Sequence, residues 1–286
     1  MAAKIIDGKK VAEAVKKDLK KRIPKLGFKP GLAVVLVGDN PASELYVKLK
    51  EKAGKELGFH FELYRLDKDT DELALLNLID KLNQDKKIHG MLVQLPLPKQ
   101  IDEKLIIDAI RPDKDADGLN PINMGNLLGG NNTVIPATPK GVIKLIESTG
   151  IKIEGKHAVI VGRSNIVGKP VSVLLQQKNA TVTMCHSKTE PLEEYTKQAD
   201  ILVVAAGKPR LITADMVKKG AVVIDVGINK VMGKSIGDVD FDDVKKVAGY
   251  ITPVPGGVGP MTIAMLLENV LQCIWLQGKL KTELLS

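Results

Sequence analysis

Short apolar runs alternate with helix-like segments through the first third of the chain. The runs at 32–37, 59–66 and 88–95 are rich in aliphatic residues, and the segments 42–57 and 71–82 between them are rich in helix formers. Short aliphatic runs are typical of strands buried in a parallel sheet and joined by crossover helices. The pattern predicts a β-α-β-α-β unit, whose ligands would gather at the carboxyl ends of the strands.

The same alternation begins again after a polar, glycine-rich stretch at 111–139. Strands are predicted at 157–161, 180–184, 200–204 and 221–226, with helices at about 168–178, 191–198 and 213–219. Residues 231–250 have no clear period, and an apolar helix is predicted from 261 to 275. We therefore predict an α/β protein of two lobes, with parallel sheets flanking a cleft and a C-terminal lobe that is Rossmann-like and doubly wound.

A glycine-punctuated turn follows the apolar run that ends at Val161. Gly162 would let the chain leave its strand sharply, and the amino-terminal end of the helix after it favours a phosphate. The spacing departs from the dinucleotide fingerprint G-x-G-x-x-G, because Ser164 stands at the second glycine and Gly168 comes one residue late. Alone, the motif is equally typical of an ordinary strand-to-helix turn.

The residues after the second predicted strand of this lobe indicate the type of cofactor. A dinucleotide fold that binds an unphosphorylated ribose has Asp or Glu there, about 20 residues past the glycine turn. This chain instead has Ser187 and Lys188, with Arg163 beside the turn. Cations and hydroxyl donors suit a ribose that carries a phosphate, so we predict NADP rather than NAD. Solvated surface charges are the alternative interpretation of the two cations.

Composition argues against several other classes of protein. Among 286 residues, 42 Lys and Arg face 34 Asp and Glu, and the net charge of +8 is scattered. Because aromatic residues make up only 3%, we expect no base-stacking surface and no nucleic-acid partner. The 2 cysteines and 4 histidines are unclustered, so we expect no metal site and a reducing, cytoplasmic setting. We predict neither a signal peptide nor a segment long and apolar enough to span a membrane.

The predicted helix at 42–57 carries two candidates for chemistry. Tyr46 and Lys50 are four residues apart and therefore share a face. We expect the buried stripe beside them to consist of Leu45, Leu49, Ala53 and Leu57. A lysine at such an apolar rim loses solvation, which lowers its pKa and makes the neutral amine accessible. An exposed helix lysine and a packed tyrosine are the ordinary alternatives.

Two further candidates follow a predicted strand and a turn. Gln94 lies near the end of its strand, where its side-chain amide could hydrogen-bond the lysine nitrogen or a reacting oxygen. Asp117 places a carboxylate immediately before the glycine turn at Gly118. A strand-end surface amide and a turn-forming aspartate are the ordinary alternatives.

Five segments carry a resemblance to a known family. They are PASELYVKLK at 41–50, VQLPLP at 93–98, PDKDADG at 112–118, VGRSNIVGKP at 161–170 and PVPGGVGPMT at 253–262. In this order they closely resemble the methylenetetrahydrofolate dehydrogenase/methenyltetrahydrofolate cyclohydrolase family. The resemblance implies a bifunctional enzyme of one-carbon metabolism with a part in purine biosynthesis. One step passes a hydride from methylenetetrahydrofolate to NADP, and the other hydrolyses the methenyl product to formyltetrahydrofolate.

The resemblance also implies roles for individual residues. Lys50 resembles the family's catalytic lysine, and Gln94 the glutamine that tunes it. Tyr46 resembles the tyrosine that packs on the folate, and Asp117 the aspartate that holds the pterin. The folate-side loop would contain Pro253, Gly256, Gly257 and Val258. The cofactor side would contain Gly162, Arg163, Ser164, Gly168 and Ser187, with Ile228 near the nicotinamide.

The expected organisation follows from the same resemblance. Residues 1–138 and 268–286 would form a folate-binding catalytic domain, and residues 139–267 a Rossmann-like NADP-binding domain. Family members are commonly homodimers, so we expect a homodimer that acts on tetrahydrofolate derivatives. One alternative is another NADP-dependent dehydrogenase, of amino-acid or shikimate type, that shares the nucleotide lobe alone. The other is a basic nucleic-acid-binding protein, which only the +8 charge favours.

Overall fold

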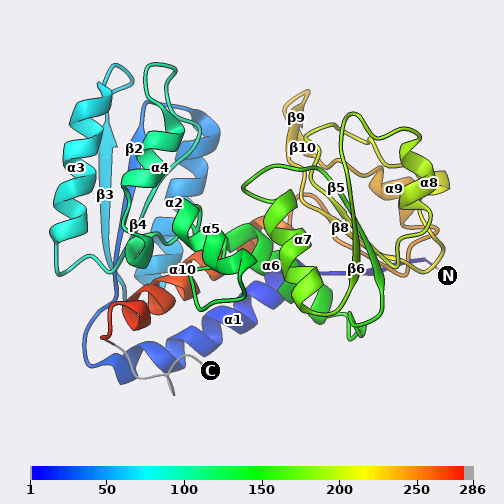
Figure 1. The fold of residues 1–286 in the computed structure, drawn as a ribbon, viewed down its shortest axis with the longest axis horizontal. Helices are drawn as coiled ribbons and strands as arrows, with labels where there is room; N and C mark the ends of the chain where they lie inside the picture. Colours follow the sequence, from blue (N-terminus) through cyan, green and yellow to red (C-terminus); the bar gives the residue numbers. More distant parts are fainter. Residues whose placement is uncertain (1, 280–286) are drawn as a thin grey trace. The chain divides into compact units, whose positions relative to one another are not determined.

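The computed structural model describes residues 2–279 and contains two compact units (Figure 1). One unit comprises Met1–Ala14 and Thr138–Thr262, and the other comprises Val15–Ala137 and Ile263–Ser286. Each unit combines a parallel sheet with helices, which confirms the predicted α/β class.

A three-stranded parallel sheet forms the centre of the second unit. Strand β2 (Gly31–Val37) lies between β3 (His60–Leu66) and β4 (Gly90–Val93), and all seven residues of β2 are buried. The crossovers are α2 (Pro41–Glu56) and α3 (Glu72–Gln84). The predicted β-α-β-α-β unit is therefore confirmed, and β4 is shorter than the predicted strand at 88–95.

Two helices of this unit were not predicted. Helix α4 (Glu103–Ala109) is only seven residues long, too short to present a helical period. Helix α5 (Pro121–Leu128) lies in the polar, glycine-rich stretch at 111–139, for which no helix was predicted. Its start is nevertheless encoded locally, because the side chain of Asn120 accepts a hydrogen bond from the N–H of Ile122 and Pro121 occupies the first turn.

A six-stranded parallel sheet forms the centre of the first unit. Its order is β1-β11-β8-β7-β5-β6. The strands are β1 (Lys4–Ile5), β5 (His157–Val161), β6 (Thr181–Cys185), β7 (Ile201–Val204), β8 (Val222–Asp225) and β11 (Tyr250–Ile251). The direction of winding reverses between β5 and β7, as the predicted doubly wound, Rossmann-like arrangement requires. Strands β1 and β11 were not predicted, because two residues each are too few for a sequence pattern.

The connections of this unit differ from the predictions in two places. The predicted helix at 213–219 is only a 3-10 turn at Ala214–Met216. The segment without a clear period contains an antiparallel hairpin, β9 (Asn229–Val231) with β10 (Lys234–Ile236), and the short helix α9 (Phe241–Val244).

Three helices include the points at which the chain passes from one unit to the other. They are α1 (Gly8–Arg22), α6 (Ala137–Glu147) and α10 (Val258–Leu276). By length and composition alone α10 could cross a membrane, so the expectation that no segment passes that test was wrong. About two thirds of it is buried in the protein (67% of its most apolar window), which is typical of a core helix of a globular protein.

Candidate active site

The side chains of Lys50 and Gln94 meet beside the three-stranded sheet. The Nζ of Lys50 donates a hydrogen bond of 3.0 Å to Oε1 of Gln94. Only 4% of Lys50 is exposed. Burial lowers the pKa of this lysine, and the negative charge of Asp117 partly offsets that effect. The amine is thus desolvated and hydrogen-bonded to a neutral acceptor, so its uncharged form is easier to reach than that of a surface lysine.

Lysine 50 belongs to the buried stripe of α2, where leucines were expected. The buried residues of this helix are Ser43, Val47, Lys50, Ala53 and Gly54, and their spacing is helical. Leu45 and Leu49, which were predicted to be buried, are 54% and 42% exposed. The predicted stripe is therefore confirmed for Ala53 and Leu57, which are buried, and wrong for Leu45 and Leu49. It went wrong because leucine and lysine positions both repeat with a helical period along α2. The small residue Gly54 decides the face, since a Cβ there would lie 3.1 Å from the ring of Phe61 in β3.

Hydrogen bonds around Gln94 determine which end of its amide faces the lysine. The backbone N–H of Gln94 donates to the carbonyl of Val35 in β2 at 2.8 Å. The side-chain Nε2 donates to the carbonyl of Leu95 at 2.9 Å. The hydroxyl of Ser43 donates to the same carbonyl at 3.3 Å. With Nε2 engaged in this way, Oε1 is left to accept from Lys50. Ser43 was not singled out from sequence, because its partner lies 52 residues away.

Tyr46 lies one helical turn before Lys50 and is half-buried. Burial raises the pKa of its phenol, so the side chain is a neutral ring at physiological pH. Asp117 is also half-buried, and its carboxylate is close enough to act on the pKa of Lys50. The structure therefore brings Lys50, Gln94 and Asp117 together within one unit and places Tyr46 on the same helix as the lysine.

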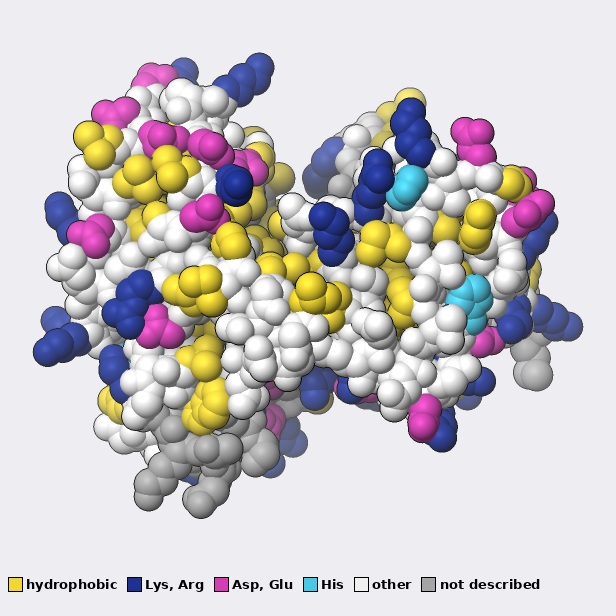
Figure 2. Space-filling model, in the orientation of Figure 1, with side chains coloured by type: hydrophobic (Ala, Val, Ile, Leu, Met, Phe, Trp, Pro, Cys, Tyr) yellow, Lys and Arg dark blue, Asp and Glu magenta, His cyan; other side chains and the backbone are white. Residues whose placement is uncertain are grey.

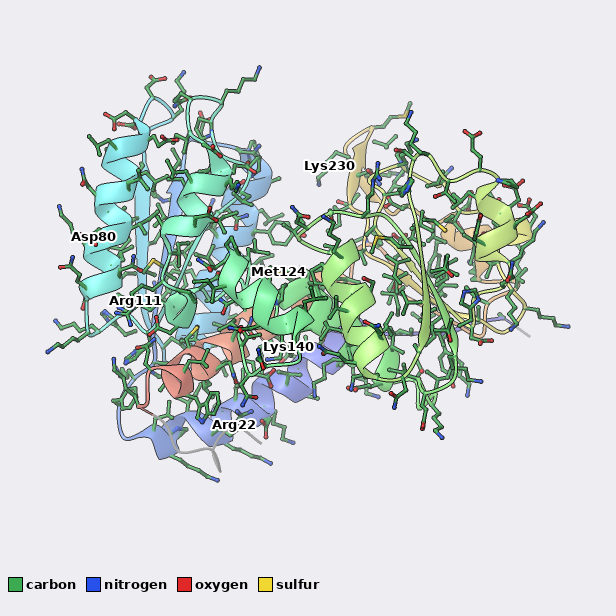
Figure 3. The ribbon with its side chains drawn as sticks, in the orientation of Figure 1. Arg22, Asp80, Arg111, Met124, Lys140 and Lys230 are labelled. Atoms are coloured by element: carbon green, nitrogen blue, oxygen red, sulfur yellow. The ribbon has the colours of Figure 1, made fainter. Side chains whose placement is uncertain are left out.

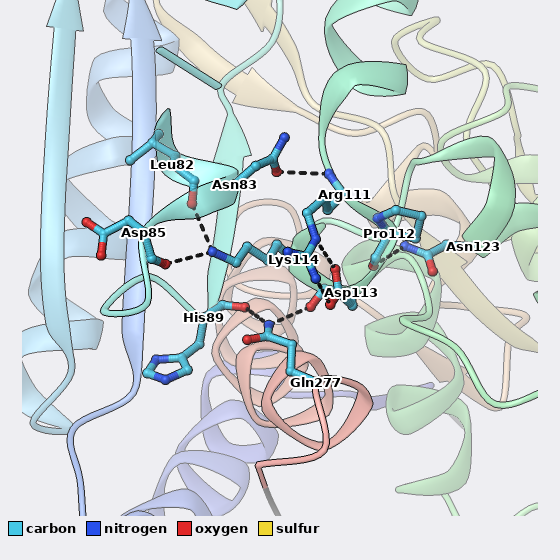
Figure 4. A network of polar contacts seen from close by, with 10 residues as sticks. All are labelled: Leu82, Asn83, Asp85, His89, Arg111, Pro112, Asp113, Lys114, Asn123 and Gln277. Atoms are coloured by element: carbon cyan, nitrogen blue, oxygen red, sulfur yellow. Dashed lines mark hydrogen bonds and ion pairs between the residues drawn. The ribbon is translucent and has the colours of Figure 1, made fainter. Parts of the chain in front are cut away.

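The segment before Asp117 is fixed by a network that ties it to several elements (Figure 4). The Nζ of buried Lys114 donates to the carbonyls of Leu82 and Asp85, at 2.9 and 2.7 Å, and so caps the end of α3. Burial, followed by the charge of Arg111, lowers the pKa of Lys114 to about 8. The Nε2 of Gln277 donates to the carbonyls of His89 and Asp113, at 2.7 and 2.8 Å. These contacts hold the backbone of 112–114 in place.

The carboxylate of Asp115 holds the backbone on the other side of Asp117. It accepts hydrogen bonds from the N–H groups of Gly118 and Asn120, at 3.0 and 2.7 Å, and from Nδ2 of Asn123 at 3.0 Å. Burial raises its pKa to about 6 despite these donors. Gly118 has a φ of +74°, and a Cβ there would lie 2.7 Å from the backbone of Ile135. The glycine turn is therefore required, and it fixes Asp117 between two anchored residues.

The glycines of the predicted phosphate loop are required by the structure. Gly162 has a φ of +131°, and a Cβ would lie 2.2 Å from the carbonyl oxygen of Ala205. Gly168 begins α7 (Gly168–Gln177), and a Cβ there would lie 2.2 Å from the carbonyl oxygen of Gly162. The hydroxyl of Ser164 accepts from the N–H groups of Val167 and Gly168, at 3.2 and 3.4 Å. The loop thus folds tightly back on its strand and exposes its outer backbone.

The remaining cofactor-side candidates lie at one edge of the six-stranded sheet. Arg163, Ser187 and Ile228 follow β5, β6 and β8, and all three are exposed. The strands are parallel, so their carboxyl ends share one edge. Figure 2 shows Lys and Arg side chains gathered at the end of this unit where the β9–β10 hairpin lies, and Figure 3 places Lys230 on that hairpin. This edge suits an anionic ligand.

The predicted folate-side loop follows β11 in the same unit as the six-stranded sheet. Gly256 has a φ of +107°, and a Cβ on Gly257 would lie 2.6 Å from the carbonyl oxygen of Pro253. Val258 is buried at the start of α10. A Cβ on Gly8 of α1 would meet the carbonyl oxygen of Gly257 at 1.8 Å, so α1 packs directly on this loop. Among residues 2–279, no group of three or more His, Cys, Asp or Glu could hold a metal ion.

Comparison with known proteins identifies the family. Residues 6–117 match the catalytic domain of tetrahydrofolate dehydrogenase/cyclohydrolase, and residues 136–277 match its NAD(P)-binding domain. The chain is 56% identical over 283 residues to the bifunctional protein FolD of Brevibacillus brevis, with 98% of this chain and 100% of the relative covered.

Solved structures agree with the sequence matches. The bifunctional FolD dehydrogenase/cyclohydrolase of Campylobacter jejuni is 50% identical with a TM-score of 0.94, and the match covers 96% of this chain and 100% of that one. The Trypanosoma brucei dehydrogenase-cyclohydrolase, solved with NADP and an inhibitor, is 40% identical with a TM-score of 0.92, covering 97% and 99%.

These matches extend over both predicted lobes, which contradicts the alternative of a dehydrogenase that shares the nucleotide lobe alone. They also confirm the family resemblance, the fold class and the enzyme class predicted from sequence. The chain therefore belongs to the tetrahydrofolate dehydrogenase/cyclohydrolase family and is a bifunctional enzyme with an NAD(P)-binding domain.

Proposed function

We propose that the chain oxidises methylenetetrahydrofolate with NADP and hydrolyses the methenyl product to formyltetrahydrofolate, with Lys50 as the group that carries protons. The observation that supports Lys50 most directly is its burial combined with its 3.0 Å hydrogen bond to Gln94. A buried lysine bonded to a neutral amide can gain and lose a proton at moderate pH, whereas an ion-paired lysine would stay charged.

In the dehydrogenase step, the bound NADP supplies the hydride acceptor. The protein needs to hold the folate carbon in position and exclude water. The half-buried ring of Tyr46 offers an apolar surface for the folate, and the carboxylate of Asp117 accepts hydrogen bonds from pterin N–H groups.

In the cyclohydrolase step, water forms a bond to the electrophilic methenyl carbon and loses a proton. A carbon–nitrogen bond then breaks and the ring nitrogen takes up a proton. The hydroxyl on the same carbon loses its proton to water, which leaves a formyl group on the other nitrogen of the folate. Neutral Lys50 accepts the first proton and returns one to the leaving nitrogen. Gln94 holds the amine without adding a charge, and the charge of Asp117 keeps the protonated form within reach.

For the nucleotide, Arg163 and Ser187 bind the 2′-phosphate of NADP, and Ser164, Gly162 and Gly168 form the phosphate loop. The exposure of Arg163 and Ser187 at one edge of the parallel sheet supports this arrangement. The Trypanosoma brucei relative was solved with NADP, which agrees with the preference. Ile228 is 48% exposed and would lie near the nicotinamide.

We also propose the wider setting of the enzyme. The unit with the three-stranded sheet is the folate-binding catalytic domain, and the unit with the six-stranded sheet binds NADP. The domain boundaries expected from sequence differ from these units mainly at Met1–Ala14. The protein acts in the cytoplasm as a homodimer and provides formyltetrahydrofolate for purine biosynthesis.

Replacement of Lys50 tests the proposal. Lys50→Met should abolish cyclohydrolase activity while circular dichroism and thermal unfolding remain those of a folded protein. Lys55→Met is the matched control, because Lys55 lies on the same helix but is exposed and paired with Glu51. Full retention of both activities in Lys50→Met would remove Lys50 from the mechanism.

A further inference from the structure

Two carboxylates without a predicted role are buried at the carboxyl end of β8. Asp225 is the last residue of β8 and Asp238 follows the β9–β10 hairpin. They are only 3% and 0% exposed. Carboxylates are rarely buried to this extent unless they are paired or have several hydrogen-bond donors. Their surroundings therefore indicate what the pair does.

Asp225 connects three segments through backbone hydrogen bonds. Its Oδ1 accepts from the N–H groups of Gly227 and Asp238, at 3.1 and 3.0 Å, and its Oδ2 accepts from the N–H of Val239 at 3.0 Å. Its own N–H donates to the hydroxyl of Thr252 at 2.8 Å. Thr252 directly precedes the loop that starts at Pro253, so Asp225 ties that loop to the turn after β8.

Asp238 connects the turn after β7 to the base of the hairpin. Its Oδ2 accepts from the N–H groups of Ala206 and Gly207, at 2.7 and 2.8 Å. Its Oδ1 accepts from Nδ2 of Asn229 at 2.8 Å. Ile228 thus lies between two residues, Gly227 and Asn229, that are each bonded to one of the two carboxylates.

Two glycines leave room for the carboxylates. A Cβ on Gly227 would lie 2.2 Å from the carboxyl carbon of Asp238, and a Cβ on Gly237 would lie 1.8 Å from Oδ2 of Asp225. No side chain larger than glycine fits at either position without displacing an aspartate. The positions of the two aspartates thus depend on glycine at 227 and 237, which keeps the carboxylates in fixed places.

Burial of this pair has a cost in free energy. The hydrogen-bond partners described above are N–H groups and one side-chain amide, none of which carries a charge. Burial, with a contribution from the charge of Asp238, raises the pKa of Asp225 to about 7. Groups buried at such a cost are commonly found where a functional surface needs fixed geometry.

We propose that Asp225 and Asp238 are positioning residues for the nicotinamide end of NADP. They hold the turns at 205–207 and 226–229 in one arrangement, and Ile228 meets the ring from the second of these turns. The inference rests on the proposed function, because it assumes that Ile228 faces the nicotinamide. Neither aspartate touches the reacting atoms, and both act through the loops they hold.

The two activities of the enzyme allow the inference to be tested in one preparation. Asp238→Asn keeps the size of the side chain but replaces one acceptor oxygen with an NH₂ group, which cannot accept a hydrogen bond. Either the bond from Asn229 or the bonds from Ala206 and Gly207 are then lost. We expect it to raise the KM for NADP at least tenfold and to lower the dehydrogenase kcat. Hydrolysis of preformed methenyltetrahydrofolate, which needs no NADP, should stay within twofold of the wild type. Asn229→Ala breaks the same link from the other side and should give the same split.

Asp243→Asn is the matched control, because Asp243 also accepts from a backbone N–H, that of Ala214 at 3.0 Å, but not in these turns. It should leave the KM for NADP unchanged. The inference is overturned if Asp238→Asn and Asn229→Ala both bind NADP normally. It is equally overturned if both activities fall in parallel with the melting temperature. A wild type that lacks either activity would instead refute the proposed function.

Discussion

Gln94→Glu should silence the cyclohydrolase by holding Lys50 in its charged form. The substitution is nearly isosteric and replaces a neutral acceptor, 3.0 Å from the lysine nitrogen, with a carboxylate. At an effective dielectric constant of about 20, unit charges about 3 Å apart attract by roughly 5 kcal/mol. An added negative charge this close raises the lysine pKa and so opposes the lowering caused by burial.

The assay is the pH dependence of methenyltetrahydrofolate hydrolysis, followed by the loss of methenyl absorbance. In the wild type the rate should depend on the neutral amine at moderate pH. In Gln94→Glu it should fall at least 100-fold, in line with the usual loss when general acid–base catalysis is removed. Binding of NADP, measured separately by titration, should be unchanged.

Gln198→Glu is the matched control, since it adds the same charge at an exposed glutamine on another unit of the chain. It should hydrolyse methenyltetrahydrofolate at the wild-type rate. A Gln94→Glu variant with the wild-type rate and pH profile would refute the reasoning, because the protonation of Lys50 would then not control the step.

Three further predictions concern the cofactor, acid stability and the phosphate loop. Arg163→Ala should raise the KM for NADP at least tenfold more than the KM for NAD, and equal effects on both would argue against a contact with the 2′-phosphate. Burial lowers the pKa of His89 from 6.5 to about 4. Between these pH values the unfolded chain binds a proton that the folded chain does not, so the free energy of unfolding decreases as the pH is lowered. His89→Asn keeps an acceptor for the N–H of Gly31 but has no group that titrates in this range. Between pH 7 and pH 4 the wild type should therefore lose about 3 kcal/mol more unfolding free energy than the variant, at 1.36 kcal/mol per pKa unit. Equal losses in the two proteins would contradict this. Gly162→Ala should cost roughly 2 kcal/mol or more, because its Cβ meets the oxygen of Ala205 and its φ is positive, and an unchanged melting temperature would refute that constraint.

Sequence reasoning succeeded where a local pattern carries the information. The longer aliphatic strands of both sheets could be predicted, because β2 and its counterparts are apolar on both faces, and so could most of the helices between them. The exceptions are β1, β11 and the 3-10 turn at Ala214–Met216. The cap at the start of α2 is also local, since the side chain of Asn40 accepts from Ala42 and Ser43. The hydrogen bond between Lys50 and Gln94 was anticipated from the places of the two residues on their elements and is confirmed.

The rest depends on contacts between distant segments. Whether Lys50 or its leucine neighbours face inward depends on Phe61 in β3, which no period along α2 can reveal. Lys114 appears in sequence as one basic residue among many, and its partner carbonyls lie 32 and 29 residues away. Asp238 looks like a turn residue, yet it bonds to N–H groups 32 and 31 residues earlier.

The central claim is tested most directly by incubating the purified protein with methylenetetrahydrofolate and either NADP or NAD. Methenyl and formyl products would be followed in the same reaction. The account predicts that methenyltetrahydrofolate forms rapidly with NADP, slowly with NAD, and passes on to formyltetrahydrofolate. If no methenyl product forms with either nucleotide, or if it accumulates without enzymatic conversion to the formyl product, the account is contradicted.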